Sequence, residues 1–297
     1  MRDDPDRGGN ILDSLVRVIP RDRRDTLGEG PLWSSRAQAL FWVDILDKRV
    51  NRLRLADDQI SSWELPEVVG WLVERETAPG FVAGIGRRFA ALTLDPLSIE
   101  TIAAPEEERD GNRFNDAKAD ARGRIWAGSM DFGCELPTGS FYRLDPDGKA
   151  TRVDDGYTIA NGPAIAADGS FLLHTDTALR TIFRYAIHDD GTLGPRAPHI
   201  VFDKAWGNPD GMTFDAEGGL WVACWGGSCV ARFDTAGRRE RSIALPASQI
   251  TSCAFAGDRL DRMFVTSAAD GVDEEHGGAL FEVDPGCIGL APCRFAG

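Results

Sequence analysis

The sequence lacks the features of a membrane-spanning or nucleic-acid-binding chain. Its 297 residues contain no uninterrupted apolar run of the roughly 18 residues that a membrane helix needs. Basic residues are outnumbered, with 33 Lys and Arg against 47 Asp and Glu, so the formal net charge is −14. Phosphate binding requires clustered basic side chains, and the only such cluster is Arg21 to Arg24. We therefore expect neither a membrane nor a nucleic-acid partner.

The N-terminal segment is also poor in apolar residues. Met1-Arg-Asp-Asp-Pro5 lacks the hydrophobic stretch of a signal peptide, so we expect a cytoplasmic protein. Residues 1–24 are polar, and we interpret them as a flexible tail in which the basic cluster is solvated. The remaining residues, 25–297, are expected to form a single domain.

Several catalytic and metal-binding motifs are missing. There is no G-x-S-x-G sequence, and the four histidines show no H-x-x-x-H spacing. The six cysteines include no C-x-x-C pair, so reduced, packed thiols are expected rather than a zinc site. Cys287 and Cys293 are the two most able to form a disulfide, but the sequence leaves open whether they do.

Sustained helical periodicity is scarce, and a strand pattern recurs instead. A polar turn, often with glycine, leads into an apolar strand six times, with anchor residues Trp42, Val82, Trp126, Leu172, Trp221 and Phe264. The anchors are separated by 40, 44, 46, 49 and 43 residues. A period of roughly 40 to 50 residues with several short strands per unit is typical of a β-propeller blade. The sequence therefore predicts an all-β, six-bladed β-propeller with a central channel.

Polar residues precede the anchors at a common distance. Asn115, Asn161 and Asp210 each lie eleven positions before an anchor, and Glu29 occupies the corresponding region of the first repeat. Each could serve an ordinary turn, because Asn and Asp are common there. Their shared phase instead favours one polar ring, since equivalent strand positions converge on the axis of a propeller.

The ring contains the ligand types that hard divalent cations prefer. Glu29, Asn161 and Asp210 offer two carboxylates and one amide oxygen. We expect one divalent ion in the channel, with Ca²⁺ as the first candidate and Mg²⁺, Mn²⁺, Zn²⁺ and Fe²⁺ as alternatives.

Six ordered segments carry a family resemblance. They are Leu27-Gly-Glu-Gly-Pro31, Arg113-Phe-Asn-Asp116, Gly123-Arg-Ile-Trp-Ala-Gly-Ser-Met130, Asn161-Gly-Pro163, Pro209-Asp-Gly-Met212 and Ile250-Thr-Ser-Cys253. With them, residues 25–297 resemble the SMP-30/gluconolactonase family, also called regucalcin-like. The resemblance implies a six-bladed propeller that hydrolyses sugar lactones with one metal ion in its channel.

The resemblance also implies roles for single residues. Glu29, Asn161 and Asp210 would bind the metal, and Asp210 would also act as the catalytic base. Arg113 and Asn115 would contact the substrate, although Arg113 could instead form an ordinary salt bridge. An acidic residue that binds sugar hydroxyls in the family has no clear equivalent here, which leaves Asp131 or Glu135 as the substitute.

Two functions remain open at this stage. The first is metal-dependent hydrolysis of an aldonolactone, such as a glucono-, xylono- or arabinonolactone, with Asp210 assisting the attack of water. The second is a non-enzymatic propeller that binds Ca²⁺ or a small ligand, because a fold does not by itself determine a function.

Overall fold

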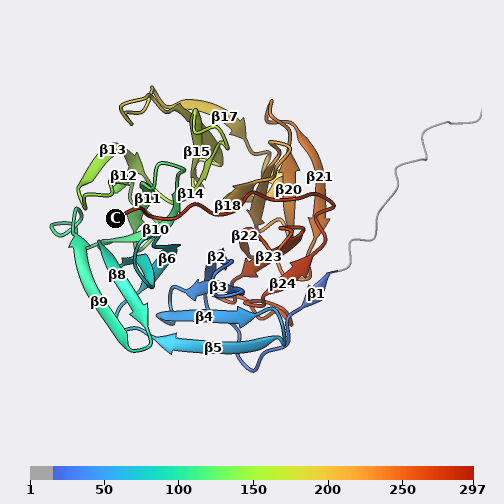
Figure 1. The fold of residues 1–297 in the computed structure, drawn as a ribbon. Helices are drawn as coiled ribbons and strands as arrows, with labels where there is room; N and C mark the ends of the chain where they lie inside the picture. The colour runs from blue at the N-terminus through green and yellow to red at the C-terminus, as the bar shows by residue number, and fades with distance from the viewer. Residues whose placement is uncertain (1–15) are drawn as a thin grey trace, which may run out of the picture.

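Six antiparallel sheets of four strands each surround a central channel (Figure 1). A computed structural model of the protein describes residues 16–297. Consecutive strands pair within five of the sheets, which are meanders, and in the sixth β1 joins the meander of β22, β23 and β24. This architecture confirms the six-bladed all-β fold that the repeat predicted.

The strands of the first three blades are given from the channel outward. They are β2 (Gly28–Ser34), β3 (Ala39–Asp44), β4 (Arg49–Arg54) and β5 (Gln59–Glu64); β6 (Val69–Glu74), β7 (Phe81–Ile85), β8 (Arg88–Leu94) and β9 (Leu97–Ala103); and β10 (Asn112–Ala119), β11 (Ile125–Asp131), β12 (Gly139–Leu144) and β13 (Ala150–Tyr157).

The other three blades follow the same order. They are β14 (Ala160–Ile165), β15 (Phe171–Asp176), β16 (Thr181–Ala186) and β17 (Ala197–Val201); β18 (Asn208–Phe214), β19 (Leu220–Trp225), β20 (Cys229–Phe233) and β21 (Arg239–Ala244); and β22 (Ile250–Ala256), β23 (Arg262–Ser267), β24 (Phe281–Val283) and β1 (Arg17–Val18). Within residues 16–297 the one helix is the short 3-10 turn η1 (Lys204–Trp206), and no helix there could cross a membrane.

The six predicted anchors all lie on the second strand of a blade, and each is fully buried. They pack in apolar clusters with residues of adjacent strands and blades. The repeat seen in the sequence is therefore the repeat of the blades. The polar segment before each anchor becomes the innermost strand, as the propeller interpretation required.

Three of the anchors are tryptophans whose indole is fixed by a buried aspartate. Nε1 of Trp126 donates to Asp120 at 2.8 Å, and Nε1 of Trp221 donates to Asp215 at 3.0 Å. Asp120 and Asp215 begin the turn before the anchor strand and accept backbone N–H groups there. In the third pair, Nε1 of Trp42 donates to Asp25 at 2.9 Å. An arginine completes each group, since Nε of Arg232 donates to Asp215 at 2.7 Å. One carboxylate thus stabilises the turn, the tryptophan and the arginine together.

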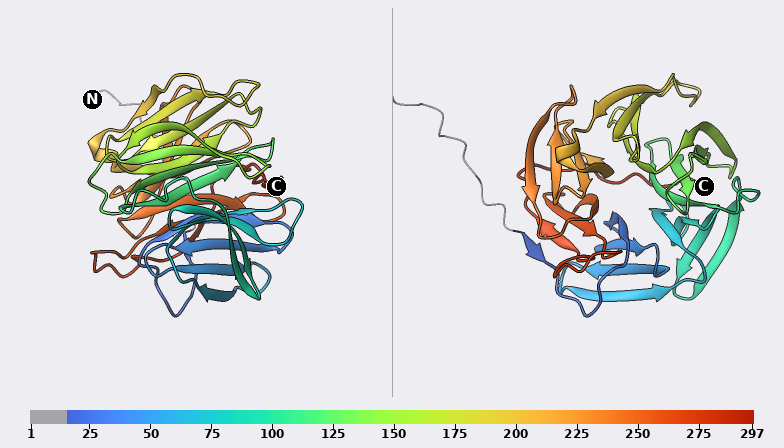
Figure 2. Two further views of the ribbon diagram at one scale, coloured as in Figure 1. Left: turned by 90° about the vertical axis from the view of Figure 1, so that its left-hand side faces the viewer. Right: turned by 180° about the vertical axis from the view of Figure 1, so that it is seen from behind.

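The N-terminal segment belongs to the propeller further upstream than we expected. Arg17–Val18 form β1, which pairs with β24 and supplies the outermost strand of the last blade (Figure 2). Nη1 of Arg17 also donates to Glu282 at 3.0 Å. The domain therefore begins before residue 25, while the predicted tail at residues 1–15 lies outside the described residues.

In the basic cluster at residues 21–24, Arg21 and Arg24 contact the propeller, so they are not part of a solvated tail. Arg21 bonds the buried Asp25 at 2.7 Å and lies over the ring of Trp42. Arg24 donates to the backbone oxygen of Glu274 at 2.7 Å. The sequence could not show the contact of Arg24, because Glu274 lies 250 residues away.

We expect Asp215→Ala to lower the free energy of unfolding by about 3–5 kcal/mol, because the change removes the one buried carboxylate that bonds Arg232 and leaves the buried donors of Trp221 and Gly219 without their acceptor. Asp234→Ala is the matched control. Asp234 begins a similar turn in the same blade, but its partner Arg238 is exposed, so a loss of about 1 kcal/mol or less is expected. Urea titration of both variants measures the difference, and equal losses would contradict the proposed role of the buried group.

Candidate functional site

The pairing of the innermost strand with the second strand shifts register in every blade. The shifts lie between Glu29 and Leu32, Val69 and Leu72, Phe114 and Asp116, Asn161 and Ala164, Pro209 and Met212, and Ile250 and Ser252. A β-bulge bends its strand and redirects side chains, and bulges are common beside functional sites. The polar residues found in the sequence lie at or within these bulges. Local backbone irregularity therefore positions the ring.

Five of the predicted site residues are brought together in the channel. Glu29, Arg113, Asn115, Asn161 and Asp210 come from four different innermost strands, and each is at most 5% exposed. Neighbouring innermost strands contact one another around the whole ring. Residues separated by as many as 181 positions thus share one buried polar site.

A chain of hydrogen bonds links three blades across the site. Nδ2 of Asn115 donates to Oδ1 of Asn161 at 2.7 Å and to the backbone oxygen of Ala160 at 2.8 Å. Nδ2 of Asn161 donates to the hydroxyl of Thr177 at 2.8 Å, and that hydroxyl donates to the backbone oxygen of Pro209 at 2.7 Å. These bonds fix the amide of Asn161 with its oxygen turned toward Asn115. One lone pair of that oxygen remains for a further partner.

Arg113 is the positive charge of the site. Its Nη1 donates to Oδ1 of Asn115 and to the backbone oxygen of Phe114, and its guanidinium lies 5.8 Å from the ring centre of Phe132. Burial lowers the pKa of Arg113, while the nearby negative groups, including Glu29 and Asp210, act to raise it. Asn115 therefore holds both Arg113 and Asn161 in place.

Three buried carboxylates inside the channel have raised pKa values. Burial, followed by the charge of Asp116, raises the pKa of Glu29 to about 8. Burial, followed by the charges of Glu29 and Asp116, holds the pKa of Asp210 well above its usual range. Burial also raises the pKa of Asp116 to about 6, an effect that Lys118 opposes. Without a compensating cation, the ring is therefore an unfavourable place for full ionisation.

The chemistry of these oxygens fits a hard cation. Oδ1 of Asp210 is buried without a hydrogen-bond partner, and Oε2 of Glu29 accepts only the N–H of Gly30, at 2.9 Å. Within residues 16–297 no three His, Cys, Asp or Glu side chains form a metal-binding group, so a cation here would need the Asn161 amide beside the two carboxylates. That donor set consists of oxygen alone, as Ca²⁺ and Mg²⁺ prefer.

The predicted substrate residue Asp131 has a different local partner. It ends β11, and its carboxylate accepts the N–H groups of Glu135 and Leu136 at 3.0 and 3.2 Å, which lowers its pKa. The Glu135 side chain is exposed. The same loop nevertheless approaches the ring, because the ring centre of Phe132 lies 5.8 Å from the guanidinium of Arg113. A contact from Asp131 or Glu135 to a sugar stays a prediction.

Two contributors were missed by sequence reasoning. Asp116 belongs to the Arg113–Asp116 motif, but only its neighbour Asn115 has the spacing shared by the ring residues. The register shift in β10 places both side chains at the channel. Thr177 follows β15 and had no sequence signal. His174 packs against Phe141 at a ring separation of 3.9 Å, and burial lowers its pKa to about 3. This histidine is therefore a neutral packing residue.

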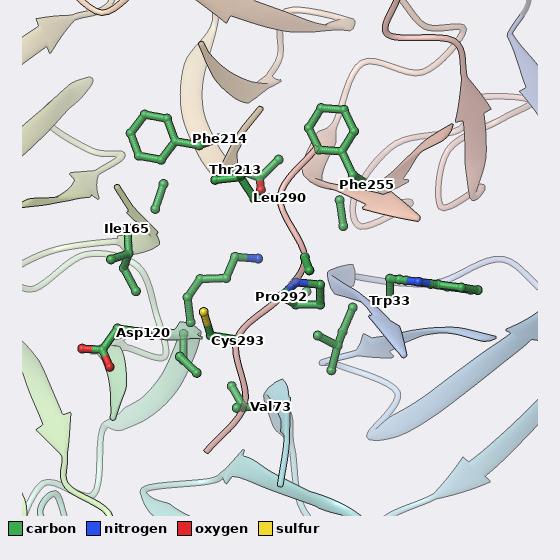
Figure 3. A pocket seen from close by; sticks show the side chains of 18 of the residues that line it. Trp33, Val73, Asp120, Ile165, Thr213, Phe214, Phe255, Leu290, Pro292 and Cys293 are labelled. Atoms are coloured by element: carbon green, nitrogen blue, oxygen red, sulfur yellow. The ribbon is translucent and has the colours of Figure 1, made fainter. Parts of the chain in front are cut away.

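A cavity of about 250 Å³ lies at the other end of the channel (Figure 3). Its walls come from the far ends of the innermost strands, including Trp33, Ile165 and Phe214, and from residues 290–293 of the C-terminal segment. That segment crosses the channel and is hydrogen-bonded to two blades, through Ile288 to Ala216 and through Phe295 to Glu74. Asp116 borders this cavity, whereas Glu29, Asn161 and Asp210 do not line it. Those three ring residues therefore lie beyond this cavity along the channel.

The family model for the SMP-30/Gluconolactonase/LRE-like region matches residues 27–269. The chain belongs to this family. The match spans Glu29 and all the other ring residues, and it confirms the family that the sequence motifs resembled. Among relatives, a Bacillus subtilis protein with the provisional name sugar lactone lactonase YvrE is 33% identical, over 94% of this chain and 98% of its own length.

Solved structures of family relatives share the whole propeller. A luciferin-regenerating enzyme aligns with a TM-score of 0.89 and 30% identity over 95% of this chain and 99% of its own. A regucalcin from Agrobacterium tumefaciens, described as a calcium-binding protein, has the same TM-score with 26% identity, covering 95% of this chain and 97% of its own. The family fold therefore extends beyond the segment that the family model matches.

We expect Glu29→Gln to flatten the pH dependence of stability in chelated protein. The folded state keeps a proton on Glu29 up to about pH 8, whereas an unfolded glutamate loses it near its ordinary pKa of 4.5, so stability falls as the pH rises through that window. Between pH 5 and pH 8 the loss of unfolding free energy should be smaller in the variant by about 3–4 kcal/mol. Urea titrations at both pH values measure it.

The control for this measurement is Glu100→Gln, at an exposed position on β9. It should leave the pH dependence unchanged. Identical pH profiles for wild-type protein and Glu29→Gln would contradict a buried, proton-binding Glu29.

Proposed function

We propose that the protein hydrolyses a sugar lactone to its aldonic acid, with a divalent cation held by Glu29, Asn161 and Asp210. The observation that carries the proposal is the unpartnered, buried Oδ1 of Asp210 among carboxylates whose pKa values are raised by burial and by one another. Ionisable groups perturbed in this way cluster at functional sites. Membership of the family and the name of the Bacillus subtilis relative support the lactone as substrate.

Asp210 is the residue that we assign to proton transfer. Its carboxylate would accept a proton from the water that attacks the lactone carbonyl carbon. When the ring C–O bond breaks, the same carboxyl would return the proton to the departing ring oxygen. Proton transfer by a positioned side chain typically contributes about 10²–10⁴ in rate. A bound divalent cation would polarise the carbonyl and stabilise the charge that develops on its oxygen.

Arg113 and Asn115 would orient the substrate. The guanidinium of Arg113 keeps donors beyond Nη1, which bonds Asn115 and Phe114, and these could reach ring or hydroxyl oxygens. Asn115 already gives both amide hydrogens to the protein, so its contribution would be through its oxygen and through the placement of Arg113. Asp131 remains the third predicted substrate contact, from the loop that also carries Phe132.

Ca²⁺ is the first candidate for the cation, because the donors are oxygens and a structural relative is described as calcium-binding. The same observation favours a second function, a propeller that binds Ca²⁺ without turnover. The two functions differ in what removal of the cation changes: catalysis and stability in the first case, and stability alone in the second.

The test of the proposed function is acid release from a panel of five- and six-membered aldonolactones. Chelated protein should show only the spontaneous rate, and adding back Ca²⁺, Mg²⁺, Mn²⁺ or Zn²⁺ should restore turnover with at least one ion and one lactone. A rise in melting temperature without turnover for any combination would support the non-enzymatic function instead.

We expect Asp210→Asn to lower turnover by at least about 10²-fold, because an amide cannot accept the proton from water. Asp168→Asn is the matched control, since Asp168 lies on an exposed turn of the neighbouring blade and should retain full activity. Melting curves with and without cation accompany the kinetics. Full turnover by a folded Asp210→Asn protein would exclude Asp210 as the base.

A further inference from the structure

Two cysteines face each other at the hairpin of the fifth blade. Cys224 is the penultimate residue of β19, Cys229 begins β20, and the antiparallel register pairs them directly across residues 225–228. Such opposed residues project to the same side of a sheet, with Cβ atoms about 4.5–5.5 Å apart. A disulfide needs a Cβ separation of about 3.5–4.5 Å. A small local approach is therefore sufficient to bring the two sulfurs within bonding distance.

The surroundings confine both thiols to one apolar pocket beside a positive charge. Cys224 and Cys229 belong to the same core cluster, and both are free thiols. Nη2 of Arg239 lies 3.5 Å from Sγ of Cys229, and the guanidinium of Arg239 is held 5.3 Å from the ring centre of Trp206. A neighbouring cation stabilises a thiolate, which is the nucleophilic form of cysteine.

The two thiols are chemically unequal. A hydrogen bond from Cys224, supported by the charge of Arg239, lowers the pKa of Cys229 to about 7. The same hydrogen bond and burial raise the pKa of Cys224 well above its usual range. One sulfur is thus prepared to attack, while the other stays protonated until the attack has occurred.

The other four cysteines offer no comparable arrangement. Burial raises the pKa of Cys253 to about 12 and that of Cys134 above its usual value. Cys287 and Cys293, the two that the sequence marked as most able to bridge, pack against different core clusters and also have raised pKa values. All four are free thiols.

We propose that Cys224 and Cys229 are a redox-active dithiol that hydrogen peroxide converts to an intramolecular disulfide. The Cys229 thiolate attacks one peroxide oxygen, the O–O bond breaks, and Cys229 sulfenic acid and hydroxide form. The hydroxide takes the Cys224 thiol proton and becomes water. The Cys224 sulfur then attacks the Cys229 sulfur and expels a second hydroxide, which becomes water with the proton that Cys229 released on ionisation. Two thiols lose two electrons and two protons, and one peroxide yields two waters.

A disulfide between Cys224 and Cys229 would lie beside the strand that carries Asp210. Cys224 pairs with Pro209, the residue before Asp210, and Trp225 pairs with Asn208. A disulfide would therefore crosslink the hairpin that backs the Asp210 strand. The proposal itself concerns the bond and is independent of lactone hydrolysis.

The test is peptide mapping of wild-type protein after reduction, limited exposure to hydrogen peroxide and alkylation in denaturant. Trypsin releases residues 205–232, whose only cysteines are Cys224 and Cys229. We expect this peptide to lose alkylation and to become lighter by the two hydrogens of a disulfide, and dithiothreitol should restore double alkylation. Residues 263–294, which hold Cys287 and Cys293, form the internal control in the same digest.

The deciding result is the rate at which peptide 205–232 loses alkylation relative to peptide 263–294. Peptide 205–232 should lose alkylation at least about tenfold faster than peptide 263–294, because only Cys229 combines a low pKa with a facing thiol. In Cys224→Ala, Cys229 should remain as a sulfenic acid that dimedone traps. A doubly alkylated 205–232 peptide after peroxide treatment, equal loss in both peptides, or a disulfide between two molecules would overturn the proposal.

Discussion

Three buried carboxylates with raised pKa values are held inside the channel, and the rest of the site depends on how the fold keeps them there. Burial of Glu29, Asp116 and Asp210 would favour their neutral forms, and Arg113 and Lys118 only partly oppose that tendency. Unfavourable electrostatics of this kind persist when the surrounding structure is rigid. Here the rigidity comes from six sheets whose innermost strands contact one another in a closed ring.

Every blade combines a regular, buried second strand with an innermost strand whose pairing is irregular. Buried second strands carry the anchors, and in three blades a buried carboxylate accepts the indole N–H of an anchor tryptophan. The innermost strands instead depart from regular pairing, each with a register shift at the level of the polar ring. Regular strands therefore provide stability, whereas irregular ones provide the geometry of the site. A perfectly paired innermost strand would direct every second side chain into the wall between blades.

The repeat made the fold and the ring readable from the sequence, because apolar anchors and polar residues recur with the period of the blades. Glu29, Asn161 and Asp210 were found in this way. Asp116 and Thr177 were not, because their positions follow from a bulge and from a turn after β15, and neither leaves a periodic signal. The N-terminal boundary was misplaced for a related reason: β1 has only two residues, and its partner strand lies at the other end of the chain. The thiol pair escaped a search for C-x-x-C because strand register, not sequence spacing, brings Cys224 and Cys229 together.

The pairing of β1 with β24 also determines when the ring can form during synthesis. Arg17 and Glu282 are separated by 265 positions, so β1 cannot pair until β24 has been synthesised. Five blades can each fold as local meanders while the chain is still growing, but the sixth needs both ends. The polar ring draws on strands of four blades and is complete only when its innermost strands close together. A growing chain would therefore carry partial rings with exposed blade faces, and the closing contact is among the most non-local in the molecule.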